Sequence, residues 1–329
     1  MKFGPVPACE AEGAVLAHSV ALPDARLRKG RVVSAQDVAA LSAAGIETVI
    51  VARLEQGDIP EDAAAARLAA AVLAPGAGLQ ANDPFTGRVN LIAEGPGVIV
   101  LDVAALERVN AVHPMITIAT VPAHQQIAAR GMAATIKIIS YAVPEAALDA
   151  ACAAAGPGAI RRAAPCLRSA TLIVTEIPGG VGDKGRKAIE ARLNALDMTL
   201  ETVVMVRHAA DPLAEAIARS GSDLVLILTG SATSDPEDVA PTALRRAGGQ
   251  VTRFGMPVDP GNLLFLGDLD GRPVIGLPGC ARSPALNGAD WVMSRVICGL
   301  TPTGADIAAM GVGGLLKEIP TRPQPRRGR

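Results

Sequence analysis

Asp223–Leu228 (DLVLIL) and the loop that follows it, 229–241 (TGSATSDPEDVAP), decide the fold. Every residue after Asp223 in the first segment is apolar, which is typical of a parallel strand covered by helices on both faces. The second segment begins with small hydroxyl residues, continues with acidic ones and leads into a helical pattern. A buried strand followed by a loop and a helix is one step of a βαβ unit, so this stretch predicts an α/β domain.

Strand-like and helix-like segments alternate on both sides of this stretch. At Asp211 and at Asp235, an Asp suited to the N-cap position is followed by a Pro suited to the first helical turn. The order predicts a doubly wound, three-layer α/β domain with a mostly parallel sheet at residues 165–303. Strands are expected at 170–175, 201–206, 223–228, 263–266 and 273–276, and helices at 185–196, 211–220, 235–247 and 283–298.

Residues 1–160 have a less regular pattern, which predicts a mixed α/β or α+β region. Helices are expected at 34–44, 62–73 and 144–154, and the segments Arg88–Ile92 and Gly97–Leu101 are expected to form a hairpin around 94–96. A Gly- and Pro-containing segment, 156–165, marks the predicted domain boundary. Residues 318–329 are rich in Pro and Arg and are predicted to be a basic tail.

Composition excludes several function classes. The 31 basic and 32 acidic residues lack the basic excess of a dedicated nucleic-acid binder, and only 2% of the residues are aromatic, which is too few for base-stacking platforms. Apolar runs do not approach the ~18 residues of a membrane helix. The five cysteines are scattered without a CxxC spacing, so we expect free thiols and a cytoplasmic location.

The loop 175–185, between the first strand and helix of the C-terminal domain, is the first candidate site segment. Doubly wound domains bind ligands at the carboxyl ends of their strands, where this loop is expected to lie. Its glycines expose backbone N–H groups just before a helix, which suits an anion. A flexible turn explains the same composition equally well. The candidate binding residues are Glu176, Gly179, Gly180 and Gly182.

The loop 229–241 is the second candidate segment. Its small residues are suited to phosphate oxygens, and Asp235, Glu237 and Asp238 place three carboxylates at one helix start, as a magnesium site would. Capping of that helix is the alternative, and it accounts fully for Asp235. The candidate phosphate-binding residues of this loop are Thr229, Gly230, Ser231, Thr233 and Ser234.

The third candidate segment is 276–284 (GLPGCARSP). Pro278 and Gly279 shape a turn that permits close approach of a ligand, and Arg282 is placed to pair with a phosphate. A further turn holds Pro260, Gly261 and Asn262, for which a structural and a binding role are equally supported.

These segments together resemble the molybdopterin-binding domain shared by enzymes of molybdenum-cofactor biosynthesis. That family has a strand ending in TGG, a helix start of the form (S/D)PxDVTP, a PxxPG turn and a GLPG turn. The equivalents are 229–231 (TGS), 235–241 (DPEDVAP), 257–261 (PVDPG) and 276–279 (GLPG), within residues 168–300. The N-terminal segments 12–20 and 29–51 resemble, more weakly, the molybdotransferase branch.

The resemblance implies a ligand and a chemistry. The ligand is molybdopterin, a pterin dithiolene with a terminal phosphate, or its adenylylated form. Asp238 matches the acid that the family uses with Mg²⁺, Glu176 an acid of the first loop, and Gly230, Ser231 and Gly279 positions that cradle the ligand. The sequence departs from the family at Ser231, which replaces a second Gly, at Asn262, which replaces the Lys of the molybdotransferase turn, and at 280–281.

Three functions remain open at the level of sequence. The first is adenylyl or molybdate transfer to molybdopterin with Mg²⁺ at Asp238 and Asp235. The second is a non-catalytic carrier that hands the cofactor to a molybdoenzyme or another cofactor-biosynthesis protein, which the Asn262 departure favours. The third is a relative of nucleotide pyrophosphatases. We expect a homo-oligomer, with no nucleic acid or membrane as partner.

Overall fold

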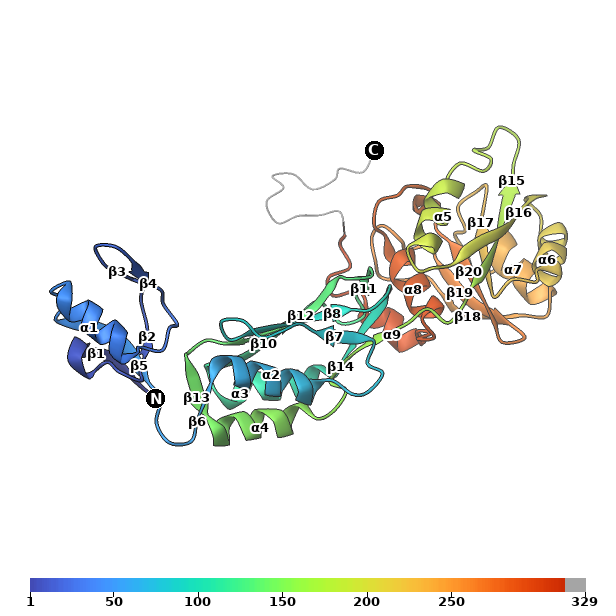
Figure 1. Cartoon of the computed structure of the whole chain (residues 1–329). Coiled ribbons are helices and arrows are strands. Elements are labelled where there is room, and N and C mark those ends of the chain that lie inside the picture. The colour runs from blue at the N-terminus through green and yellow to red at the C-terminus, as the bar shows by residue number, and fades with distance from the viewer. Residues whose placement is uncertain (317–329) are drawn as a thin grey trace. The chain divides into compact units, whose positions relative to one another are not determined.

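The computed structural model describes residues 1–316, which fall into two compact units (Figure 1). The first unit comprises residues 1–94, 99–123 and 130–162. The second comprises residues 95–98 and 124–129 and the chain from Ala163 onward. The predicted basic tail at 318–329 lies outside the described residues.

The first unit is an α+β structure with small antiparallel sheets. Its N-terminal part has the strand order β1-β5-β2, and Leu41 of α1 packs with Val49 and Val51 of β5 in a buried cluster. Ser34 and Asp37 form a capping box at the start of α1. The elements of this part are β1 (Lys2–Pro7), η1 (Ala8–Glu10), β2 (Val15–Leu16), β3 (Val20–Ala21), β4 (Arg26–Leu27), α1 (Ala35–Ala43) and β5 (Thr48–Arg53).

The rest of the first unit has a four-stranded sheet with the order β10-β12-β8-β7. The buried residues of α2 include Leu68 and Val72, and this helix contacts β8 and β12. The elements are β6 (Asp58–Pro60), α2 (Glu61–Val72), β7 (Leu79–Ala81), β8 (Arg88–Ala93), α3 (Val103–Val112), β10 (Ile116–Thr120), β12 (Met132–Ile138), β13 (Ala142–Pro144), α4 (Glu145–Ala155) and β14 (Ile160–Ala163).

The hairpin predicted between residues 88–92 and 97–101 is wrong. β8 pairs with β12 and with β7, whereas β9 (Gly97–Leu101) pairs with β11 (Gln126–Ile127). The apolar pattern of a strand shows which face is buried but leaves its neighbour open, so a short apolar segment can pair with a strand far along the chain.

The second unit contains a six-stranded sheet with the order β16-β15-β17-β20-β19-β18. The strands β16, β15, β17 and β20 are parallel, and β19 and β18 are antiparallel to their neighbours. The strands are β15 (Ser169–Glu176), β16 (Thr199–Arg207), β17 (Leu224–Leu228), β18 (Gln250–Phe254), β19 (Phe265–Leu269) and β20 (Arg272–Leu277). All five residues of β17 are buried, as its apolar sequence predicts.

Helices cover both faces of this sheet, with α5 and α8 on one side and α6 and α7 on the other (Figure 1). On the α6–α7 side, Leu213 and Ile217 of α6 and Leu244 of α7 pack with Ile227 and Phe265 of the sheet. The helices are α5 (Arg186–Asn194), α6 (Ala210–Arg219), α7 (Val239–Arg246), η2 (Gly279–Arg282), α8 (Gly288–Ile297) and α9 (Gly304–Ala309). The predicted three-layer, mostly parallel α/β domain is confirmed.

Three predicted helix starts are wrong. The N-cap residue of α6 is Ala209 and not Asp211. Ala209 offers no side-chain hydrogen bond to the first turn of the helix. Asp238 caps α7 instead of Asp235. The helix expected from residue 283 begins at Gly288, because Asn287 and Asp290 form a capping box there. An Asp–Pro pair is also a common turn, so it does not mark a helix start uniquely.

Asp223, which directly precedes β17, forms hydrogen bonds with the amino end of the neighbouring strand β15. One carboxylate oxygen accepts the backbone N–H groups of Arg168 (2.7 Å) and Ser169 (3.0 Å), and these bonds, the Arg168 bond first, lower the pKa of Asp223. A carboxyl whose pKa is lower in the folded state adds stability above its unfolded pKa and loses it as the pH falls through the folded pKa.

We therefore expect Asp223→Asn to lower the thermal midpoint at neutral pH and to flatten its decline below the ordinary pKa of aspartate. Thermal unfolding measured across the acidic range tests this. A variant whose acid profile parallels that of the wild type would contradict it.

Candidate functional site

The candidate loops lie at one edge of the six-stranded sheet. Val174 of β15 is beside Leu228 of β17, which is beside Leu277 of β20, so these parallel strands end at the same level. Phe265, the first residue of β19, is beside Gly276, which brings the connection 255–264 to this edge as well. The predicted loops 175–185, 229–241 and 276–284 therefore extend from one edge, as the doubly wound fold requires.

Thr175 joins the ends of three strands. Its side chain is buried, and its Oγ1 lies 2.8 Å from Nδ1 of His208, which follows β16. The same oxygen accepts the N–H of Gly230, which follows β17, at 2.9 Å. Thr175 and His208 were not among the predicted site residues, because their separation in sequence conceals the contact.

Arg282 ties the three loops together. Its guanidinium donates to the carbonyl oxygens of Lys184 (2.6 Å) and Gly182 (3.3 Å) in the first loop and of Thr229 (2.9 Å) in the second. Partial burial lowers the pKa of Arg282. The sequence predicted that Arg282 pairs with a phosphate, whereas in the structure these donors go to backbone carbonyls and set the spacing of the loops.

Arg192 of α5 holds the third loop from the other side. It forms an ion pair with Asp290, and both side chains are nearly buried, with 10% and 13% of their surface exposed. It also donates to the carbonyl oxygens of Ala281 (2.9 Å), Ser283 (2.8 Å) and Ala285 (3.1 Å). Sequence reasoning missed this residue; the NxxD capping pattern at 287–290 is the signal that marks its partner.

The glycines of the loops fall into two groups. A Cβ on Gly180 would lie 2.9 Å from the carbonyl oxygen of Ile177, and one on Gly230 would lie 2.7 Å from that of Thr175. These two glycines are therefore required by packing. A Cβ on Gly179, Gly182 or Gly279 would meet no atom within 4 Å, so open space lies in front of these three.

A cavity of about 450 Å³ lies beside the first loop at the start of α5. Three of its lining residues, Lys184, Arg186 and Lys187, are basic, and the other three are Asp183, Gly185 and Glu190. The positive side chains and the N-terminus of α5 both favour an anion. The three basic residues were not singled out from the sequence, although they directly follow the predicted glycines.

The three predicted metal ligands make local contacts. The Asp238 carboxylate accepts the N–H groups of Val239 (2.7 Å) and Ser234 (3.0 Å). Asp235 accepts the N–H of Glu237 (2.8 Å), and Glu237 pairs with Arg245 (3.3 Å). Within residues 1–316, no three His, Cys, Asp or Glu side chains gather closely enough to hold a metal ion. The magnesium site at these three carboxylates therefore stays a prediction.

The remaining predicted residues occupy the same edge in different surroundings. Thr229 and Thr233 are buried, with their hydroxyl oxygens 3.3 Å apart, whereas Glu176 and Ser231 are exposed. Pro278 is the N-cap of η2.

The predicted turn at 260–262 packs against the start of α8. The carbonyl oxygen of Pro260 accepts the N–H of Gly288 at 2.8 Å, and a Cβ on Gly261 would lie 2.7 Å from that nitrogen. The side-chain amide of Asn262 donates to the carbonyl oxygen of Met256 at 3.3 Å. These contacts give the turn a structural role.

Residues 169–295 match the protein family described as “Probable molybdopterin binding domain”. This segment is a molybdopterin-binding family domain. The resemblance found in the sequence motifs is thereby confirmed. Residues 5–53, ahead of the molybdopterin-binding domain, match a domain of unknown function, DUF8806.

Two solved structures from Pyrococcus resemble the chain that carries the molybdopterin-binding domain. A molybdopterin biosynthesis moea protein from Pyrococcus horikosii is 15% identical, with 91% of this chain and 75% of that chain covered and a TM-score of 0.31. A molybdenum cofactor biosynthesis protein from Pyrococcus furiosus is 12% identical, with 92% and 66% covered and a TM-score of 0.27. No curated protein matches the chain.

The sequence also led to expectations about disulfides and about membrane-spanning helices. The five cysteines, all of which lie among the described residues, form no disulfide there. Among the described residues, none of the helices combines the length and the apolar character needed to cross a bilayer.

Proposed function

We propose that residues 169–295 bind molybdopterin or its adenylylated form, as part of molybdenum-cofactor biosynthesis in the cytoplasm. The observation that carries the proposal is the open space in front of Gly179, Gly182 and Gly279, at the edge where the loops meet. The family match supplies the class of ligand. The basic cavity beside Gly185 supplies a place for its anionic end.

The terminal phosphate is assigned to the first loop. Lys184, Arg186 and Lys187 surround the start of α5 and offer positive charge there. Phosphate binding at a helix start combines backbone N–H groups with the positive end of the helix dipole. Phe265 is fully buried in the core and is not available to stack on a pterin. Backbone polar groups of the second and third loops are therefore assigned to the pterin.

The sharpest test of this site is Gly279→Val. The position has an ordinary backbone conformation and space for a side chain, so we expect the thermal midpoint to stay close to that of the wild type. The added side chain occupies the space assigned to the ligand, and we expect the affinity for purified molybdopterin to fall about tenfold or more, which corresponds to ~1.4 kcal/mol.

Gly4→Val is the matched control, because a Cβ on Gly4 would also meet no atom within 4 Å and this residue lies in β1, outside the molybdopterin-binding domain. Binding is measured by the fluorescence of the pterin. Equal affinities of Gly279→Val and Gly4→Val would contradict the proposed site.

A transfer reaction is the finer form of the proposal, with adenylyl or molybdate transfer dependent on Asp238. Asp238 lies on the second loop, and each of its oxygens accepts one N–H and keeps a lone pair for a further contact. The position of Asp238 on the second loop supports this role. Because one oxygen caps α7 and the other accepts the N–H of Ser234 in the second loop, a carrier that only binds the cofactor is the second candidate function.

Asp238→Asn separates these two candidates. Asn retains an acceptor for the helix cap, so we expect the free energy of unfolding to change by no more than about 1 kcal/mol. Transfer from adenylylated molybdopterin in the presence of molybdate is expected to be lost, because the carboxylate charge is gone. Equal rates for the wild type and Asp238→Asn would remove Asp238 from the mechanism, and binding without turnover in both would favour the carrier.

A further inference from the structure

A cavity of about 580 Å³, here called the β7–β8 cavity, lies on the first unit, outside the molybdopterin-binding domain. Gln80 is opposite Ile92 in these paired strands, and Asn82 and Glu94 lie two residues further along each chain. These four lining side chains therefore share one face of the sheet. Leu91 is buried on the opposite face, where α2 contacts β8 (Figure 1). The cavity is thus on the face that α2 leaves open.

Charged side chains mark both ends of the β7–β8 cavity. Arg130 donates its backbone N–H to the carbonyl oxygen of Ala93 at 2.8 Å, so it lies beside the end of β8, where Glu94 follows. Asp83 marks the other end, because the residue before it donates its N–H to the carbonyl oxygen of Asn90 at 3.1 Å. Asn90 and Ala93 are separated by about 10 Å along the strand. The cavity therefore has a cation and a carboxylate at one end and a second carboxylate at the other.

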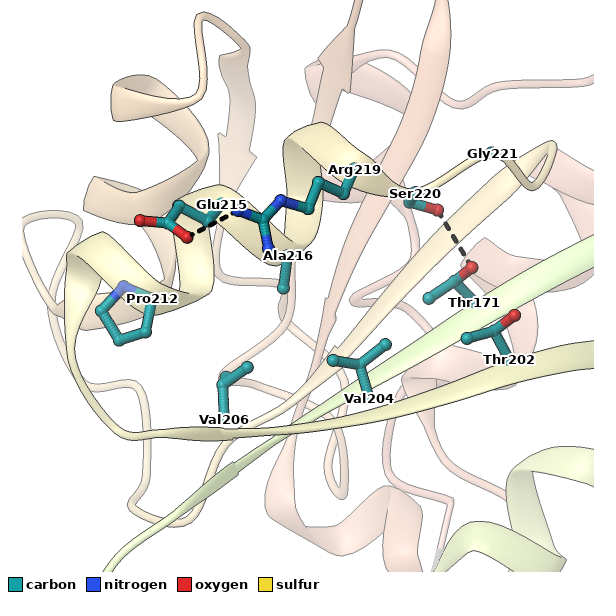
Figure 2. Close-up of a pocket in the computed structure, with 10 residues that line it drawn as sticks. All are labelled: Thr171, Thr202, Val204, Val206, Pro212, Glu215, Ala216, Arg219, Ser220 and Gly221. Carbon is teal, nitrogen blue, oxygen red and sulfur yellow. Dashed lines mark hydrogen bonds and ion pairs between the residues drawn. The ribbon is translucent and has the colours of Figure 1, made fainter.

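The charged side chains of the β7–β8 cavity are not paired with one another. In the part of the chain that the structure describes, the side chains of Asp83, Glu94 and Arg130 form neither an ion pair nor a hydrogen bond. The cavity between β16 and α6 is different, because its charged residues Glu215 and Arg219 pair with each other at 3.2 Å (Figure 2). A charged ligand of that cavity would compete with the ion pair, whereas the charges of the β7–β8 cavity are available to a ligand.

The backbone of Arg130 favours a functional role for its side chain. Its φ is 64°, in the left-handed region, where a residue with a Cβ is less stable than glycine. Residues in this conformation are concentrated at sites of function. A glycine would suit the backbone but would remove the guanidinium from the cavity.

We propose that the β7–β8 cavity binds a free dibasic amino acid, of which lysine is the simplest example. Lysine has a carboxylate and an ammonium on one carbon and a second ammonium at the end of a four-carbon stem. The carboxylate is assigned to Arg130, whose fork of donors suits it, and the α-ammonium to Glu94 at the same end. The second ammonium is assigned to Asp83. Each charge of the cavity then meets an opposite charge.

The size and floor of the cavity suit this ligand. Pockets for small molecules have volumes of about 300–1,000 Å³. Ile92 lies between the two charged ends and offers an apolar surface to the stem. Because the cavity is outside residues 169–295, the inference does not depend on the proposed molybdopterin site, and its test needs no pterin.

Calorimetric titration of the full chain with L-lysine is the first measurement, at low ionic strength because salt screens exposed charges. We expect one lysine to bind per chain. Norleucine lacks the second ammonium and cadaverine lacks the carboxylate, so we expect each to bind about tenfold more weakly, as the loss of a hydrogen bond to a charged group implies. The absence of lysine binding, or binding of norleucine or cadaverine as tight as that of lysine, would overturn the proposal.

Asp83→Asn tests the position of the second ammonium. We expect this variant to lose the preference for lysine over norleucine while its affinity for norleucine stays that of the wild type. Asp24→Asn is the matched control, because Asp24 is also exposed and lies in the first unit, outside the cavity. We expect the control to bind lysine as the wild type does. A full preference for lysine in Asp83→Asn would overturn the proposal.

Arg130→Gly separates binding from stability. It removes the partner of the carboxylate and suits the positive φ, so we expect lysine affinity to fall about tenfold or more, with a thermal midpoint no lower than that of the wild type. Asp270→Gly is the backbone control, because Asp270 has a φ of 54° and lies in the second unit. We expect this control to keep its affinity for lysine. Wild-type affinity in Arg130→Gly would overturn the proposal.

Discussion

Replacing Arg192 with Ala is expected to lower the free energy of unfolding of the second unit by about 3 kcal/mol, because removal of one partner of a buried ion pair leaves the other charge without compensation. Asp290 is 13% exposed, and among the described residues the N–H of Asn287 would remain as its hydrogen-bond donor. The carbonyl oxygens of the third loop would lose their shared donor at the same time.

The measurement for Arg192→Ala is amide hydrogen exchange, because a chain with two units need not unfold in one step. We expect faster exchange in 278–290 and in α8. Arg186→Ala is the control on the same helix, since Arg186 is exposed and a surface substitution usually changes stability by about 0.5 kcal/mol or less. Equal protection in the two variants would contradict the structural role of Arg192.

Replacing Arg282 with Ala is expected to weaken ligand binding strongly. Its guanidinium spans carbonyl oxygens of the first and second loops, so its loss separates the parts of the proposed site. We expect the affinity for molybdopterin to fall about tenfold or more, equivalent to ~1.4 kcal/mol, with faster hydrogen exchange in 177–185 and 229–234.

Arg282→Lys distinguishes loop positioning from direct phosphate pairing. A Lys keeps the positive charge but replaces the planar fork of donors by a single ammonium group, which cannot reach both loops in the same geometry. We therefore expect Lys to restore little of the affinity and little of the exchange protection. Full recovery of both by Lys would show that charge, and not the fork of donors, is what the site requires.

The alternation of strands and helices in residues 165–303 was predictable, because each segment carries its own periodicity. The apolar run 224–228 becomes a strand buried on both faces, and Leu213 and Ile217 lie on the buried face of α6. The grouping of the candidate loops was also predictable, because parallel strands place their carboxyl ends at the same edge.

The pairing of β8 and β9 was not predictable in the same way. β8 (RVNLIA) begins with alternating polar and apolar residues and β9 (GVIVL) is apolar, so both segments are suited to strands, and a two-strand hairpin is the shortest connection between them. β8 instead lies between β12 and β7, and this choice depends on the helices and strands available around it. The N-cap of α7 was not predictable from sequence either, since Asp235 and Asp238 are both suitable caps and the structure uses Asp238.

The sequence by itself determined the class of the second unit, its family and the edge at which a ligand is expected, because repeated hydrophobic periodicity and short motifs are local properties. Only the tertiary structure decided how that edge is built. Thr175 with His208, Arg282 with the first two loops, and Arg192 with Asp290 are contacts between residues distant in sequence. Such contacts depend on the relative positions of packed elements, which no local pattern encodes.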